Sequence, residues 1–127
     1  MRFLMPHLPG EFEIPDEWID DAGFRGFKPS APAYRAPPGA TLVPLTAVEP
    51  TVRFVTHPMD GHGFARARLI RVLMGFVAGD EIEAVPAMEL PLYEFCGAPY
   101  RYRACNGYHR FYASIAAGFS MLPVRAS

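Results

Sequence analysis

The sequence predicts an α/β (α+β) fold, in which a small mixed sheet carries packed helices, and three observations support this. The chain has 127 residues, half of them hydrophobic, which suits one domain with a substantial core. Within residues 64–77, Leu69, Val72, Leu73 and Phe76 follow the spacing of one helix face. Short β-branched or alternating segments lie on both sides of this helix, and such segments are typical of strands.

Residues 1–45 differ in composition and are predicted to form an ordered, proline-rich arm that wraps the domain of residues 46–127. Proline fixes φ and lacks a backbone donor, so the arm should contain neither a long helix nor a central strand. One short helix is predicted at residues 15–21, with Gly23 as its end signal. Trp18 would then help to anchor the arm on the body.

Strands and helices should alternate through the rest of the chain. The expected order is a strand at 51–56, a loop at 57–63, the helix at 64–77 ended by Gly79, a strand at 86–93, a turn at 96–99, a strand at 100–105, a helix at 109–117 capped by Gly118, and a strand at 121–124. Pro123 predicts that the last strand lies at a sheet edge, because proline cannot donate to a ladder.

Charge and composition exclude several classes of protein. The net charge of -1 argues against a nucleic-acid surface over the whole molecule, although a local basic patch remains open. No apolar run approaches the length of a membrane span, so we expect a cytoplasmic protein with no membrane partner. Cys96 and Cys105 are too few for a disulfide scaffold and form no CxxC pair, which predicts free thiols and no metal site.

The segment Asn106–Arg110 carries the clearest chemical signal. Asn-Gly favours a tight turn, and Gly107 lets a ligand approach the backbone because it has no Cβ. The helix that follows presents free N–H groups and the positive end of its dipole, which together attract anions. His109 and Arg110 would add charge-assisted donors at the same place. The pattern therefore predicts a phosphate site, in which Asn106 and Tyr108 would also take part.

An ordinary structural interpretation of the same residues stays open. An Asn-Gly turn before a helix is often only a turn. A histidine at a helix start often hydrogen-bonds a nearby carbonyl, and an arginine there often pairs with a surface acid.

The order of elements around this segment resembles the ParB/sulfiredoxin superfamily, whose ParB side includes nuclease- and nucleotide-binding domains. The resemblance covers roughly residues 45–126 and rests on Pro86–Leu90, Tyr100–Tyr102, Gly107–Arg110 and Leu122–Val124, with the upstream helix in the family's position. It implies that His109 and Arg110 contact nucleotide phosphates and that Gly107 makes room for them. Arg68 or Arg71 would take the place of the polar contacts from the upstream helix.

The resemblance also implies a ligand and limits the activity. The ligand would be a nucleoside triphosphate of the ATP or CTP type with Mg²⁺, and the protein could hydrolyse it or transfer its phosphoryl group. Tyr108 stands where sulfiredoxins have their nucleophilic cysteine, which argues against sulfiredoxin activity. A non-catalytic DNA-associated or protein-interaction module of the same fold is the alternative, and a DNA-binding partner protein or a homodimer would suit it.

Two further candidates lie outside this segment. His57, Asp60 and His62 share one glycine-containing loop, which we interpret as an ordinary polar loop or as a loop that touches substrate; the spacing matches no standard metal site. Thiol chemistry at Cys105 is a third hypothesis, against the simpler interpretation of a small, half-buried hydrophobic residue.

Overall fold

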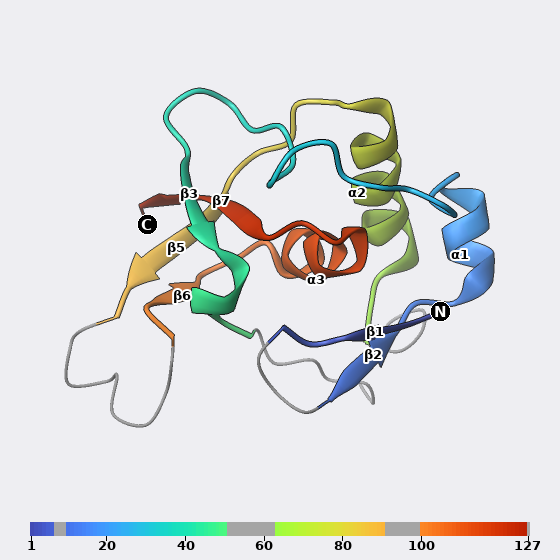
Figure 1. Cartoon of the computed structure of the whole chain (residues 1–127), viewed down its shortest axis with the longest axis horizontal. Coiled ribbons are helices and arrows are strands. Elements are labelled where there is room, and N and C mark those ends of the chain that lie inside the picture. Colours follow the sequence, from blue (N-terminus) through green and yellow to red (C-terminus); the bar gives the residue numbers. More distant parts are fainter. Residues whose placement is uncertain (7–9, 51–62, 91–99, 127) are drawn as a thin grey trace.

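The computed structural model describes residues 1–6, 10–50, 63–90 and 100–126, and these form a mixed α+β architecture (Figure 1). A five-stranded mixed sheet curls around one side of the helices, and a separate two-stranded hairpin lies on the other side. The elements are β1 (Arg2–Leu4), β2 (Glu11–Glu13), α1 (Asp16–Asp21), β3 (Thr41–Pro44), the 3-10 turn η1 (Leu45–Ala47), β4 (Val48–Glu49), α2 (Arg66–Ala78), β5 (Val85–Glu89), β6 (Tyr102–Ala104), α3 (Tyr108–Ala117) and β7 (Met121–Ala126).

The three predicted helices are present with small shifts at their ends. Helix α1 begins one residue after the predicted start, α2 begins two residues later than predicted, and α3 begins one residue earlier. Gly79 and Gly118 adopt left-handed φ values of 72° and 85° at the ends of α2 and α3, as the sequence predicted. These stop signals are local, because a residue without a Cβ takes that conformation at little cost.

The sheet has the order β3-β7-β5-β6-β4, and this order corrects the expectation that the last strand lies at an edge. Strand β7 pairs antiparallel with β3 and parallel with β5, so it is an interior strand. Pro123 is opposite Leu42 on the β3 side, whereas the register with β5 begins at Val124. Pro123, which has no backbone N–H to donate, therefore stands just before the parallel pairing with β5. An interior strand can accommodate a proline at such a position.

The N-terminal segment contributes to the core. Phe12, Ile14 and Ile19 are almost completely buried, and the ring of Phe12 meets that of Tyr112 on α3 edge-on at 5.1 Å between centroids. Strand β3 precedes residue 46 and yet pairs within the main sheet, at its edge. The division of the chain at residue 45 and the wrapping role of the arm stay predictions.

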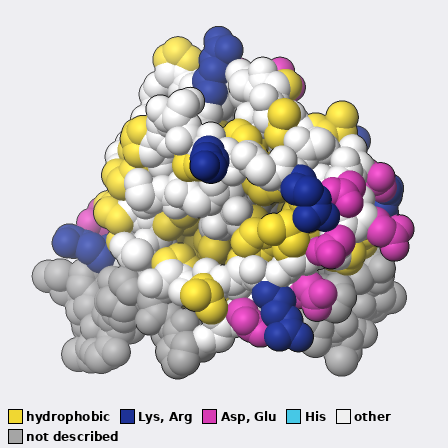
Figure 2. Space-filling model, turned by 45° about the vertical axis from the view of Figure 1, so that its right-hand side comes forward, with side chains coloured by type: hydrophobic (Ala, Val, Ile, Leu, Met, Phe, Trp, Pro, Cys, Tyr) yellow, Lys and Arg dark blue, Asp and Glu magenta, His cyan; other side chains and the backbone are white. Residues whose placement is uncertain are grey.

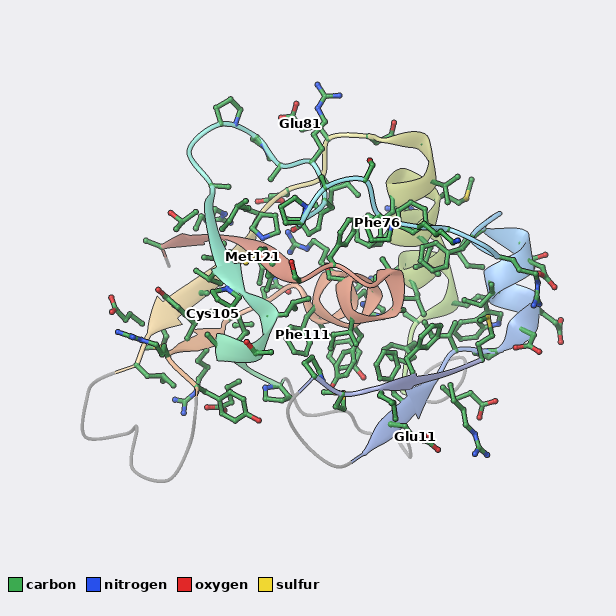
Figure 3. All side chains as sticks on the ribbon, viewed as in Figure 1. Glu11, Phe76, Glu81, Cys105, Phe111 and Met121 are labelled. Atoms are coloured by element: carbon green, nitrogen blue, oxygen red, sulfur yellow. The ribbon has the colours of Figure 1, made fainter. Side chains whose placement is uncertain are left out.

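A single hydrophobic cluster fills the space between the sheet and the helices. Its most enclosed side chains include Phe64, Leu69, Leu73 and Phe111, which are at most 1% exposed. Figure 3 shows Phe111 and Phe76 directed into the molecule, whereas Glu11 and Glu81 stand at its surface. This cluster fixes α2 against α3 and thereby places the start of α3 beside the first turns of α2.

The surface beside α1 carries paired charges of both signs. Arg25 bonds Asp20 at 2.7 Å, and Arg66 of α2 pairs with Asp21. Figure 2 shows acidic and basic side chains interspersed on this flank, next to apolar side chains in the middle of the same face. Such a mixture produces no broad field of one sign.

Several predicted segments lie outside the described residues. They are the strand at 51–56, the loop residues 57–62 with His57, Asp60 and His62, and the turn at 96–99 with Cys96. The strand predicted at 86–93 is described as far as residue 90, and it overlaps β5, which begins one residue earlier.

Candidate phosphate-binding site

A cleft of about 380 Å³ lies where the start of α3 faces the first half of α2. Its volume falls within the range of roughly 300–1,000 Å³ that small-molecule sites occupy. The cleft is lined by Arg68, Arg71, Val72, Asn106, Gly107, Tyr108, His109 and Arg110. The structure thus brings together all the residues for which the sequence and the family resemblance predicted phosphate contacts.

Gly107 joins the cleft to the start of α3 in a conformation that suits glycine. Its φ of 83° is left-handed, and it is buried against Val85. A Cβ added at this position would lie 3.0 Å from a methyl carbon of Val85 and 3.1 Å from Nη2 of Arg110. The residue therefore combines a turn with close packing under the cleft, and both features exclude a larger side chain.

The first turn of α3 has no side-chain cap. Gly107 holds the N-cap position, where no side chain can accept from the backbone, and no acidic residue lies in the first turn. The backbone amide of Gly107 is occupied, because it donates to Oδ1 of the preceding residue, Asn106, at 2.7 Å. The amides of the first helical residues carry the positive end of the dipole, and Tyr108, His109 and Arg110 at this helix start line the cleft. An anion is the natural partner for such a helix end.

Helix α2 contributes two arginines and one apolar side chain from a single face. Arg71 and Val72 lie three and four residues after Arg68, which places both of them beside Arg68 on the helix. Arg68 and Arg71 are exposed, and within the described part of the chain neither makes an ion pair or a side-chain hydrogen bond. Arg66, by contrast, points to Asp21 on α1 and does not line the cleft.

The guanidinium of Arg110 is held in place by the backbone. Its Nη1 donates to the carbonyl oxygens of Glu83 and Ala84, each at 2.9 Å. Arginine has five N–H donors, so one nitrogen can fix the side chain while the others face a ligand. Arg110 therefore keeps its charge in the cleft and has no need of an acidic partner.

His109 differs from the expected cationic donor. Its Nε2 accepts a hydrogen bond from the amide of Ala65 at 3.0 Å, which requires a neutral ring with the proton on Nδ1. Burial, together with the nearby charge of Arg68, lowers the pKa of His109 to about 4. The imidazole therefore acts as an acceptor that ties α3 to the start of α2, and the charge in the cleft comes from arginines.

Tyr108 makes a second connection of the same kind. Its hydroxyl donates to the carbonyl oxygen of Gly63 at 2.9 Å, and its ring packs against Phe64 and Tyr112. Gly63 is the first described residue after the stretch that holds His57, Asp60 and His62. Tyr108 thus anchors the chain that enters α2.

Other candidates do not join the cleft. Cys105 is exposed and free, and its Sγ donates to the carbonyl oxygen of Arg103 at 3.9 Å. Arg103 pairs with Glu49 on β4, away from the cleft lining. The described residues hold no group of three His, Cys, Asp or Glu side chains that could bind a metal ion. No helix in the described ranges has the length and apolarity required to cross a membrane.

Val72 is the lining residue for which the sequence predicted a different role. Its apolar side chain fits the core stripe of α2, and the structure leaves it half-buried at the cleft. Its spacing of four from Arg68 is the signal that could have assigned it to the same face.

No protein-family model, curated protein or solved structure matches this chain.

Proposed function

We propose that the protein binds a nucleoside triphosphate of the ATP or CTP type through its phosphates, in the cleft between α2 and α3. The observation that carries the proposal is the convergence of Arg68, Arg71 and Arg110 on the uncapped first turn of α3. Guanidinium groups and helix amides are the donors that proteins use most for phosphate oxygens. Both kinds occur here in one cleft.

The charge of the lining suits a ligand with several negative charges. The described lining contains three arginines and no carboxylate, and His109 is neutral near pH 7. A single inorganic anion would leave part of this charge unpaired, whereas a triphosphate can contact both helices. Val72 adds an apolar surface beside the arginines, against which a ribose or base can pack.

The family resemblance supports a nucleotide over other polyanions. The observed order of β5, β6, the Asn-Gly turn, α3 and β7, with α2 upstream, follows the pattern on which the resemblance to the ParB/sulfiredoxin superfamily rests. In that pattern the residues Gly107, His109 and Arg110 face nucleotide phosphates. We assign His109 a positioning role, because its Nε2 is occupied by the amide of Ala65.

Mg²⁺ fits this proposal as part of the ligand. The ion prefers phosphate oxygens and retains several waters, so it can enter with the triphosphate. The imidazole of His109 has its acceptor nitrogen occupied and cannot serve as a free base. The proposal is therefore one of binding, and hydrolysis or phosphoryl transfer is measured in the same samples as released phosphate.

Calorimetric titration with ATP, CTP, GTP and UTP, each with MgCl₂, tests the proposal directly. We expect saturable binding of at least one nucleotide and a rise in the melting temperature, because a ligand that binds only the folded state stabilises it. The double variant Arg68→Gln, Arg71→Gln should lose this binding. Arg66→Gln is the matched control, since Arg66 lies on the same helix and outside the cleft.

Two outcomes contradict the proposal. One is a nucleotide panel that produces neither heat of binding nor thermal shift. The other is an equal loss of binding in Arg66→Gln and in the double variant, which would indicate non-specific attraction to positive charge. Retention on DNA that weakens steeply with salt, without nucleotide binding, would instead support the DNA-associated alternative.

A further inference from the structure

The segment that joins α2 to β5 holds one arginine of the phosphate cleft in place. The carbonyl oxygens of Glu83 and Ala84 each accept a hydrogen bond of 2.9 Å from Nη1 of Arg110. Nη2 of the same guanidinium lies against the turn, 3.1 Å from the position that a Cβ on Gly107 would take. Glu83 and Ala84 precede β5, whose register with β7 begins at Val85. The position of the Arg110 charge therefore depends on what holds the peptide groups just before β5.

Tyr34, in the segment between α1 and β3, bonds the same stretch of backbone. Its hydroxyl donates to the carbonyl oxygen of Glu83 at 2.8 Å, so this oxygen accepts from Tyr34 and from Arg110. A backbone carbonyl has two lone pairs and can accept both hydrogen bonds. Burial raises the pKa of Tyr34 to about 12, so the hydroxyl keeps its proton well above neutral pH. The hydroxyl is therefore a constant donor to the carbonyl that anchors Arg110.

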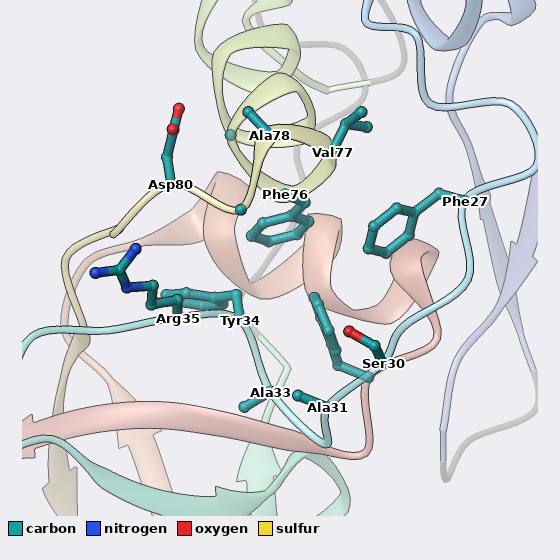
Figure 4. Close-up of a pocket in the computed structure, with 13 residues that line it drawn as sticks. Phe27, Ser30, Ala31, Ala33, Tyr34, Arg35, Phe76, Val77, Ala78 and Asp80 are labelled. Atoms are coloured by element: carbon teal, nitrogen blue, oxygen red, sulfur yellow. The ribbon is translucent and has the colours of Figure 1, made fainter.

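The hydroxyl of Tyr34 is itself fixed by packing. The residue is 5% exposed, and its ring stacks on Phe76 of α2 with the centroids 5.3 Å apart. Figure 4 shows the two rings beside each other, next to the last turn of α2. The backbone adds a contact at the adjoining position, where the amide of Ile82 donates to the carbonyl oxygen of Arg35 at 2.9 Å. A closely packed ring has little freedom to move, so its hydroxyl can hold the Glu83 carbonyl in one orientation.

Arg125 makes a contact of a different kind with the same residue. Its Nη2 pairs with the carboxylate of Glu83 at 3.1 Å, and both side chains are exposed. Exposed ion pairs of this kind contribute little to stability. The pair also engages the side chain of Glu83, whereas Arg110 is anchored on its backbone carbonyl. Of these two contacts with Glu83, the bond from Tyr34 is the one that meets the anchoring atom itself.

We propose that Tyr34 is a positioning residue of the phosphate cleft, because its hydroxyl fixes the carbonyl on which the Arg110 guanidinium is anchored. Tyr34 does not line the cleft, so it acts through Arg110. A guanidinium that is held in advance loses less freedom when a phosphate binds, and its hydrogen bonds then contribute more to affinity. The effect on affinity rests on the proposed nucleotide binding, whereas the anchoring of Arg110 can be measured without a ligand.

The ligand-free protein gives the first test. NMR relaxation of the arginine Nε–Hε groups reports the mobility of each side chain on the picosecond to nanosecond timescale. Tyr34→Phe, which removes only the hydroxyl, should lower the order parameter of Arg110. Arg68 is the internal reference, because it lines the same cleft from α2, and its order parameter should not change. The Arg110→Gln variant identifies the Arg110 signal by its loss.

Calorimetric titration with ATP and with CTP, each with MgCl₂, gives the second test. Tyr34→Phe should bind the nucleotide about twofold to tenfold more weakly than the wild type, which is the net effect of one hydrogen bond. Tyr112→Phe is the matched control, because Tyr112 is buried to a similar extent, at 4% exposed, and does not line the cleft. Arg125→Gln, which releases only the side chain of Glu83, should also leave the affinity unchanged at moderate salt. Melting temperatures establish that each variant is folded.

An unchanged order parameter of Arg110 in Tyr34→Phe would overturn the proposal, whatever the nucleotide affinity. Equal affinity in the wild type and Tyr34→Phe, despite a more mobile Arg110, would also overturn it, because the anchor would then not matter to the ligand. An equal loss of affinity in Tyr112→Phe would show a general effect of core packing and would reject a specific role for Tyr34. A wild type that binds no nucleotide, together with a more mobile Arg110 in Tyr34→Phe, would reject the proposed function and uphold the anchoring by Tyr34.

Discussion

The Nε2 atom of His109 accepts a hydrogen bond from the backbone amide of Ala65, 3.0 Å away, and this bond joins the first turn of α3 to the residue before α2. The bond forms only with a neutral imidazole, and burial keeps the ring neutral by lowering its pKa to about 4. The two walls of the phosphate cleft are thus held together by a contact that depends on pH.

The protein should lose stability as the pH falls from about 6.5 to about 4. In this window the unfolded chain protonates the imidazole at its ordinary pKa of 6.5, whereas the folded chain does not. The stability that His109 contributes is therefore fully present above its pKa of 6.5 in the unfolded chain. This contribution is lost as the pH falls towards about 4, the pKa of His109 in the folded protein. The full difference between the two pKa values corresponds to about 3 kcal/mol in the free energy of unfolding. Solvent screening of this partly buried ring reduces the expected effect to about 1–2 kcal/mol.

Urea unfolding at a series of pH values, for the wild type and for His109→Gln, measures this effect. Glutamine keeps an acceptor near Ala65 and does not titrate, so the variant should lack this part of the pH slope. Identical slopes in the two proteins would show that His109 is not held neutral by the fold.

Gly107→Ala should destabilise the protein by more than its φ value alone explains. A non-glycine residue in the left-handed region costs about 1–3 kcal/mol, and a Cβ here would also lie 3.0 Å from Val85. Gly79→Ala is the control, because Gly79 has a similar φ of 72° and no atom within 4 Å of the added Cβ. Denaturant unfolding of both variants separates backbone strain from packing, and equal losses would contradict the packing argument.

The helices could be predicted from the sequence because their signals are local. The stripe from Leu69 to Phe76 and the glycines at 79 and 118 act within one or two turns, and the structure places the helix ends within two residues of the prediction. The position of β7 could not be predicted in this way. Its partner β3 comes from residues 41–44, far away in the chain, and no local pattern shows that such a strand will pair beside Pro123.

In the phosphate cleft, too, the local features could be predicted from the sequence, whereas a contact between distant parts of the chain could not. The turn at Gly107 and the start of α3 follow from Asn-Gly and the helix pattern, and the family resemblance adds Arg68 and Arg71. The neutral state of His109 could not be predicted, because it depends on the amide of Ala65, which only the packing of α2 on α3 brings within reach.

The N-terminal hairpin should unfold together with the main sheet. Phe12→Ala removes a ring that is 2% exposed and packs against Phe64 and Tyr112, so we expect a loss of about 3–5 kcal/mol. Leu4→Ala is the control on the paired strand, since Leu4 is 76% exposed and its removal should change stability by less than about 0.5 kcal/mol. Circular dichroism and intrinsic fluorescence, followed in one urea titration, should give coincident transitions; separate transitions would show that the hairpin is an independent unit.

Nucleotide affinity should fall stepwise as phosphates are removed from the ligand. Each phosphate that meets Arg68, Arg71 or the first turn of α3 makes charge-assisted hydrogen bonds, which contribute about 1.5 kcal/mol or more each. The series ATP, ADP, AMP and adenosine should therefore weaken by about tenfold per phosphate lost, and adenosine should not bind measurably. Titrations of the four ligands at low and at moderate salt give this series. Equal affinities across it would place the recognition on the base, and would remove the arginines and the helix end from the binding site.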